Sequence, residues 1–313
     1  MNSRFLLTVS TSLLVVLPSL PAQEAKPAES APAAETPAKP KPDFIRFRQE
    51  ESTARLETAV KSYANADGVT VDLVGVVHIA DKSYYQKLNE RLAGYDAVLY
   101  ELVGDPAALK DETLRKPDNP LRSLQKLAGG MLKLDFQLDN IDYTRPNFVH
   151  ADLNEKQFGD RMKARGESLM SLLGRAMKME REGAIPGQKE MQDLALPEIL
   201  AALGSGDGAD GIKIVMAKMF GHAEEMIDSF EGKEGTVLLA ERNQVVADKL
   251  KESVDGGKKK LAIFYGAGHL QGLEELIGKQ GFEPKQEEWL AAWTMKKKPA
   301  AAPKPPTGTG RKI

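Results

Sequence analysis

The sequence LVGVVH at residues 73–78 and the sequence AVLYE at residues 97–101 decide the fold class. Each is a continuously apolar run that ends in a polar side chain, which is typical of a strand buried on both faces of a sheet. Between them, Asp81 and Ser83 are expected to begin a helix, with Ser83 and Gln86 forming a capping box, and Gly94 to end it. A strand, a helix and a strand within about 35 residues form a βαβ unit, so the two strands are predicted to be parallel.

The segments on either side extend this unit into a larger sheet. Residues 53–64 alternate as a strand, and Asp67-Gly68 is a hairpin signal that connects them to residues 69–79. Three further strands are expected at 148–150, 260–265 and 287–294.

Helical patterns fill the chain between the third strand and the last strand–helix unit. They begin at Asn154, a predicted cap with Gln157 behind it, and continue to about residue 250. The many methionines of this segment are interpreted as gap-filling core rather than as a binding groove. We therefore predict an α/β fold with a central, mainly parallel sheet flanked by helices and a large helical insertion.

Both ends of the chain differ in composition from the middle. A positive charge at Arg4 and an apolar run from residue 5 to 17 predict a signal peptide at 1–22 and an exported, periplasmic or extracellular protein. The run is short for a membrane span, so an uncleaved membrane tether is the alternative and no stable span is expected after cleavage. Pro/Ala-rich residues 23–43 and the basic residues 296–313 are predicted to be disordered, which leaves a folded domain at 44–295.

Charge and cysteine content exclude several classes of function. Residues 44–295 hold 33 basic and 41 acidic side chains, a net charge of −8, which argues against nucleic acid as a partner. There is no cysteine, which excludes disulfides, thiolate metal sites and a cysteine nucleophile. A metal site would have to use His, Asp or Glu.

Three long polar side chains follow predicted buried strands. His78 and His269 each end a Gly-x-x-His sequence, and Glu101 ends the strand between them. Ligands of open α/β sheets bind at the carboxyl ends of the strands, so these side chains are expected to converge. Two imidazoles and a carboxylate suit a divalent metal ion with positions left for water or substrate. The alternatives are a core histidine for His78 and a strand-end surface residue for Glu101.

Other polar residues have two interpretations each. His150 ends the short third strand at the same edge of the sheet and is either a site residue or bonded structurally. Arg242 lies in a helix and either forms an ion pair or contacts an anionic group of the substrate. His222 is expected to be a solvated surface residue. The glycines of residues 266–268 resemble a phosphate-binding turn, but the full dinucleotide pattern is missing.

Taken together, these motifs resemble the TraB/GumN/Tiki superfamily. The resemblance rests on VGVVHI at 74–79, YEL at 100–102, ERN at 241–243 and GAGHLQG at 266–272, in the family's order and spacing. It implies a metal-dependent hydrolase, with peptidases among the Tiki-like members, on a fold related to ChaN-like haem-binding and erythromycin-esterase-like proteins. It assigns His78, Glu101 and His269 to the metal site and catalysis and Arg242 to the family's arginine position; His150 matches no family motif.

Two functions follow as expectations. The first is an exported metallohydrolase, a peptidase of the TraB/GumN/Tiki type, in which a divalent ion polarises a carbonyl and activates water while Glu101 acts as a ligand or a general base. Catalytic residues are then Glu101, Arg242 and His150, and the substrate is a peptide or a small molecule. The alternative is a binding protein that captures haem, metal or a peptide at the same edge without turnover.

Overall fold

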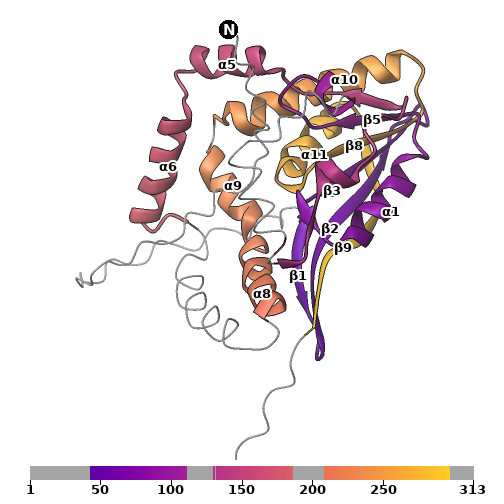
Figure 1. The fold of residues 1–313 in the computed structure, drawn as a ribbon. Coiled ribbons are helices and arrows are strands. Elements are labelled where there is room, and N and C mark those ends of the chain that lie inside the picture. Colours follow the sequence, from indigo (N-terminus) through magenta and orange to yellow (C-terminus); the bar gives the residue numbers. More distant parts are fainter. Residues whose placement is uncertain (1–42, 111–129, 131, 186–207, 233, 297–313) are drawn as a thin grey trace, which may run out of the picture.

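The computed structural model describes residues 43–110, 130, 132–185, 208–232 and 234–296 (Figure 1). The predicted signal peptide at 1–22 lies outside these ranges, as do the linker at 23–43 and the basic tail at 296–313 except for Asp43 and Lys296. The part of the methionine-rich insertion at 186–207 also lies outside them.

One mixed sheet forms the centre of the fold. Its strands are ordered β1-β2-β3-β8-β5-β7, with β9 paired along β2. The neighbours β3, β8, β5 and β7 are parallel, whereas β2 is antiparallel to β1, β3 and β9. The predicted α/β fold and parallel βαβ unit are therefore confirmed. The bounds are β1 Ile45–Gln49, β2 Thr53–Ala64, β3 Thr70–Val76, β5 Ala97–Tyr100, β7 Phe148–His150, β8 Lys260–Gly266 and β9 Glu283–Lys296.

Helices flank the sheet, with α1 on one side and α8, α9 and α11 on the other in Figure 1. The predicted helical insertion between β7 and β8 comprises α5 to α10, and a two-stranded ladder of β4 and β6 lies beside the main sheet. The bounds are β4 Ile79–Ala80, α1 Lys82–Leu92, α2 Ala107–Lys110, β6 Asp135–Phe136, α4 Gln137–Asn140, α5 Glu155–Ala164, α6 Leu169–Arg181, α8 Gly208–Phe220, α9 Ala223–Glu231, the π-helix η2 Val237–Glu241, α10 Arg242–Asp255, the 3-10 turn η3 Ala267–His269 and α11 Leu270–Lys279.

The helix α1 begins at Asp81 as predicted, but without the predicted capping box. Its N-cap is Asp81, so Ser83 lies inside the first turn and the capping box with Gln86 does not form. The Asp81 carboxylate instead accepts from Lys213 Nζ at 3.2 Å and from Thr294 N at 2.7 Å. A tertiary role has therefore replaced the local cap. The capping box of Asn154 and Gln157 at α5, in contrast, is confirmed.

Methionines of the insertion do not all lie in the core. Met162 is buried, but Met170 and Met177 of α6 are 76% and 56% exposed. The interpretation of the methionines as core is therefore wrong for Met170 and Met177, although Leu172 of the same helix is buried.

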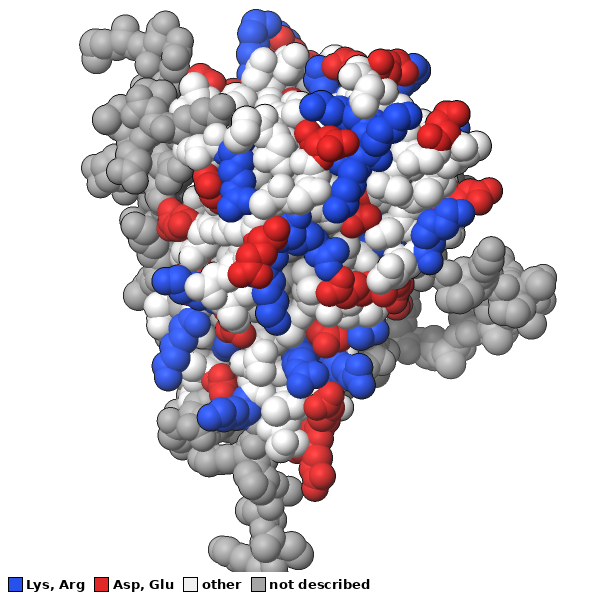
Figure 2. All heavy atoms as spheres, turned by 90° about the vertical axis from the view of Figure 1, so that its right-hand side faces the viewer, with Lys and Arg blue, Asp and Glu red and all other residues white. Residues whose placement is uncertain are grey.

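Charged side chains of both signs are interspersed on the face in Figure 2, which is the right-hand side of Figure 1. Among the described residues, no helix has the length and apolar character that a bilayer crossing requires.

Gly75 of β3 marks a place where the backbones of neighbouring elements approach closely. A Cβ there would lie 3.1 Å from Ala59 O and 3.1 Å from Leu270 Cδ1. Gly75→Ala is therefore expected to lower the free energy of unfolding by about 1–3 kcal/mol, measured by denaturant unfolding. Gly159→Ala in α5 is the control, because its Cβ would meet nothing within 4 Å. It should leave stability unchanged or raise it, and an equal loss in both variants would contradict the packing argument.

The start of β1 is attached to α9 through a carboxyl that is largely removed from water. Glu224 Oε1 accepts from Phe44 N at 2.5 Å and from Ile45 N at 3.0 Å. Burial and, to a lesser degree, Asp43 raise the pKa of Glu224 to about 7, against the opposing effects of the two N–H groups and Lys61.

A carboxyl whose pKa rises on folding stabilises the folded state in its protonated form. This contribution is present below its ordinary pKa of 4.5 and is lost as the pH rises through about 7. We expect the free energy of unfolding to decrease across this window and Glu224→Gln to reduce the decrease. The exposed Glu225→Gln is the control; a pH profile that Glu224→Gln leaves unchanged would contradict the assignment.

Candidate functional site

The candidate site lies at the carboxyl ends of three adjacent parallel strands. β8 lies between β3 and β5, with Val76 opposite Gly266 and Tyr100 opposite Phe264. His78 follows β3 and Glu101 follows β5, so the two residues flank the end of β8 on its two sides. The sheet order therefore brings together strand ends that are far apart in the sequence.

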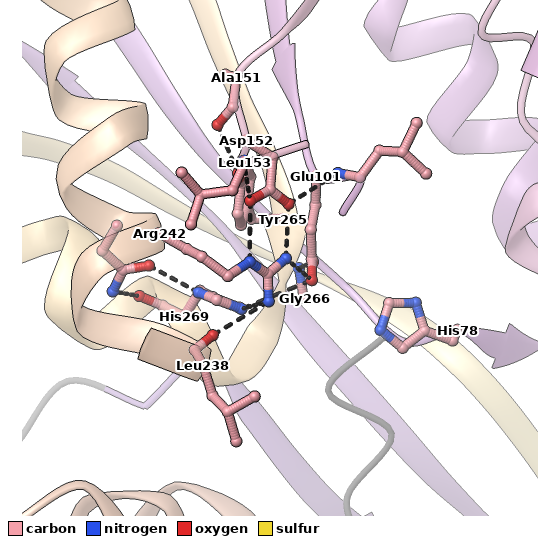
Figure 3. Close-up of polar contacts among 12 residues, drawn as sticks. His78, Glu101, Ala151, Asp152, Leu153, Leu238, Arg242, Tyr265, Gly266 and His269 are labelled. Atoms are coloured by element: carbon pink, nitrogen blue, oxygen red, sulfur yellow. Dashed lines mark hydrogen bonds and ion pairs between the residues drawn. The ribbon is translucent and has the colours of Figure 1, made fainter. Parts of the chain in front are cut away.

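Gly266 is the point on which the three predicted residues converge (Figure 3). A Cβ at Gly266 would lie 3.2 Å from Glu101 Oε2, 3.7 Å from His78 Nε2 and 3.9 Å from His269 Cδ2. The structure thus brings His78, Glu101 and His269 around one position, as their places at the strand ends predicted.

Glu101 is held in one orientation by two donors. Arg242 Nη2 donates to Oε1 at 2.6 Å, and Gly266 N donates to Oε2 at 2.8 Å. The residue is 8% exposed. Burial by itself raises the pKa of Glu101, but the Arg242 charge, together with the Gly266 N–H, outweighs it and holds the pKa at about 2. The carboxylate is therefore ionised at neutral pH.

Arg242 is the centre of a buried ion cluster. It is 0% exposed, and it donates from Nε and Nη2 to the two Asp152 oxygens at 2.9 and 2.7 Å. Nη1 donates to Leu238 O at 3.1 Å, in the π-helix that precedes α10. Burial alone lowers the pKa of Arg242, but Glu101 and Asp152 raise it above its usual value. Arg242 therefore forms the ion pair that was one of its two interpretations. The guanidinium is fully enclosed, so the other interpretation, contact with an anionic group of the substrate, stays a prediction.

His269 is a neutral imidazole with a defined tautomer. Asn243 Nδ2 donates to His269 O at 3.1 Å, which leaves Asn243 Oδ1 to accept from Nδ1–H of the ring at 2.7 Å. Nε2 therefore accepts from Arg242 Nη1 at 3.2 Å. Burial lowers the pKa of His269 to about 3, with the Arg242 charge adding to the effect and Glu101 opposing it. In this arrangement His269 is a hydrogen-bond acceptor of the cluster rather than a free metal ligand.

His78 is the half-buried member of the site. Its Nδ1 contacts Gln137 Oε1 at 2.7 Å, and Gln137 N donates to the carbonyl oxygen of His78 at 2.9 Å. Tyr85 of α1 donates to Val77 O at 2.9 Å and fixes the backbone that leads into His78. Among the described residues, His78 Nε2 makes no hydrogen bond. This atom lies 3.7 Å from the position that a Cβ on Gly266 would take.

His150 and His222 lie outside this convergence. His150 Nε2 donates to Leu102 O at 2.7 Å, and its ring lies 5.7 Å from that of Tyr100. These contacts fit the interpretation of His150 as a structurally bonded residue. Among the described residues it makes no hydrogen bond to the Arg242 ion cluster, and its catalytic role stays a prediction. His222 has a side chain 47% exposed, as expected, although it caps α9 rather than lying within a helix.

Three residues of the site were not predicted from the sequence. The first is Asp152, which also accepts from Leu102 N at 3.0 Å. Its position two residues after the end of β7 is the sequence feature that could have identified it. Asn243 adjoins Arg242 within the quoted ERN motif. Gln137 lies in a short segment without a clear period, so no sequence pattern pointed to it.

The donors that face Gly266 decide how a metal ion would fit. His78 Nε2 and Glu101 Oε2 both lie near the position over Gly266, where Oε2 also accepts from Gly266 N, whereas His269 Nε2 is bonded to Arg242. Within the described residues, no group of three or more His, Asp or Glu is arranged to hold a metal. A divalent ion would thus have two protein ligands here, with water or substrate in the other positions, and the metal stays a prediction.

Comparison of the sequence with models of known protein families and with curated proteins finds no match.

Proposed function

We propose that the protein is a hydrolase of the TraB/GumN/Tiki type that acts outside the cytoplasm, with a peptide as its expected substrate. The observation that carries the hydrolase proposal is the arrangement over Gly266. An ionised carboxylate and a histidine nitrogen with an open lone pair face one position, and a buried arginine fixes the carboxylate. Export and the peptide substrate rest on the N-terminal sequence and on the motif resemblance.

The two groups take different roles. Glu101 has a pKa of about 2 and is therefore a weak proton acceptor at neutral pH. It orients a water molecule and stabilises positive charge on the neighbouring imidazole. His78 Nε2 removes a proton from that water as it attacks the substrate carbonyl carbon, and it returns the proton to the leaving group when the carbon–nitrogen bond breaks.

Arg242 and His269 support this chemistry without contacting the substrate. Arg242 holds one Glu101 oxygen, so the other stays directed at the position over Gly266. His78 and Glu101 are also the residues that would hold a divalent ion, which when bound would polarise the carbonyl and lower the pKa of its water ligand.

The experiment is a cleavage assay with a quenched fluorescent peptide library, run with chelator and with added Mn²⁺, Co²⁺ or Zn²⁺. We expect the full chain to cleave a subset of peptides, and Glu101→Gln to lose the activity. Cleavage that chelator abolishes and added metal restores would assign His78 Nε2 to the metal rather than to the proton. No cleavage above the Glu101→Gln background would overturn the hydrolase, and tight binding without cleavage would favour a binding protein. Full activity in chelator, with no metal in the purified protein, would overturn the metal and leave His78 as the base.

A further inference from the structure

Gln137 and Tyr143 form a polar pair behind His78 that no sequence motif indicated. Gln137 Oε1 lies 2.7 Å from His78 Nδ1, and Gln137 Nε2 donates to Tyr143 Oη at 2.8 Å. Both residues are buried, at 4% and 2% exposure. Two buried polar side chains joined to each other and to a site residue are costly to keep unless every contact is satisfied.

The direction of these hydrogen bonds sets the protonation of the imidazole. Because the amide nitrogen of Gln137 donates to Tyr143, its carbonyl oxygen is the atom that faces His78. A carbonyl oxygen only accepts, so His78 must carry its proton on Nδ1. In the neutral ring this leaves the lone pair on Nε2, the atom that faces Gly266 and Glu101.

The backbone around the pair holds it in place. Gln137 N donates to His78 O, and β4 pairs with β6, with Ile79 opposite Phe136. Gln137 therefore directly follows β6, whose Phe136 lies opposite Ile79, the residue after His78. The Tyr143 ring packs against Tyr100 with ring centroids 5.2 Å apart, which anchors the far end of the pair to β5.

We infer that Gln137, held by Tyr143, is a positioning residue that keeps His78 in the tautomer with Nε2 free to accept a proton. The inference rests on the proposed function for the kinetic role of His78, but the tautomer itself is a property of the free protein. The histidine on the other side of Gly266 has a parallel arrangement, since Asn243 Oδ1 holds Nδ1–H of His269.

The primary test is nitrogen-15 NMR of the imidazole rings in the full chain without substrate, with the His78 signals assigned by their loss in His78→Ala. We expect the Nδ1–H form at neutral pH in the parent and in Gln137→Glu, which retains an acceptor oxygen. Gln137→Ala and Tyr143→Phe should shift the ring toward a mixture of tautomers. An Nε2–H form in the parent, or no change in Gln137→Ala, would overturn the inference whether or not the protein is a hydrolase.

A kinetic arm separates positioning from folding. Gln137→Ala should lower kcat by about 10–100-fold with a small change in KM, and Gln137→Glu should restore most of kcat. Gln280→Ala is the control, because it also removes a hydrogen-bonded amide, in this case a half-buried one that lies away from the site and donates to Ala247 O at 2.9 Å. Equal losses of kcat in Gln137→Ala and Gln280→Ala would contradict a specific role for Gln137.

Discussion

Arg242→Met is expected to destabilise the protein more than any other single substitution at the site, by about 3–5 kcal/mol in the free energy of unfolding. Methionine replaces the aliphatic part of the arginine side chain, so the change removes the charge and its hydrogen bonds while most of the apolar packing is kept. Glu101 and Asp152 would then be left as buried carboxylates without the cation that now lies 2.6 and 2.7 Å from them. Denaturant unfolding at neutral pH is the measurement.

A surface ion pair provides the control for this substitution. Arg161 Nη1 lies 3.0 Å from Glu241 Oε2, but its side chain is 41% exposed. Arg161→Met should therefore cost about 1 kcal/mol or less, because water replaces an exposed partner. Arg242→Lys should lie between the two, since it keeps the charge but cannot bridge two carboxylates. A loss in Arg242→Met as small as that in Arg161→Met would mean that the cluster does not stabilise the fold.

His78→Ala should have the opposite profile, a large loss of activity with little change in stability. The expected decrease in kcat/KM is about 10²–10⁴-fold, the usual contribution of a general base, on the peptide found by the library assay. Stability should change little because the side chain is half-buried and only its Nδ1 is bonded among the described residues.

Two further variants make the result on His78 interpretable. His222→Ala removes an exposed imidazole away from the site and should retain full activity. His78→Gln tests whether a neutral hydrogen-bonding side chain can replace the base, and it should remain as inactive as His78→Ala. Parent-like turnover by both His78 variants would exclude His78 as the proton acceptor.

The parts of the fold that could be predicted are those with strong local patterns. Buried runs such as residues 73–77 and 260–265 identify central parallel strands, and Asp67-Gly68 identifies the hairpin, in which Gly68 adopts φ +74°. The start of α1 at Asp81 was predicted, but its capping was not, because the Asp81 carboxylate accepts from Lys213 and Thr294 rather than from its own helix. Exposure of Met170 and Met177 was missed because helical spacing does not show which face is covered.

The site residues that could be predicted from the sequence are those that follow the ends of buried strands. His78, Glu101 and His269 come together because β3, β8 and β5 are adjacent and parallel. The βαβ unit indicated that β3 and β5 are parallel, but no sequence pattern showed that β8 lies between them. The donor and acceptor of each hydrogen bond at the site could not be predicted from the sequence. Arg242 lies 141 positions from Glu101 and 90 from Asp152 along the chain, and only the packing of α10 shows that it binds both carboxylates and engages His269.

The kcat/KM of Gly266→Ala on the peptide substrate shows directly whether the reaction takes place over Gly266. The backbone of Gly266, at φ −50° and ψ 135°, accepts alanine, but the new Cβ would lie 3.2 Å from Glu101 Oε2 and 3.7 Å from His78 Nε2. It would occupy the position that both groups face. Gly278→Ala in α11, where a Cβ meets nothing within 4 Å, is the matched control. The account predicts a loss of about 100-fold or more in Gly266→Ala with the fold retained, and parent activity in Gly278→Ala. Parent activity in a folded Gly266→Ala variant would contradict a reaction at this position.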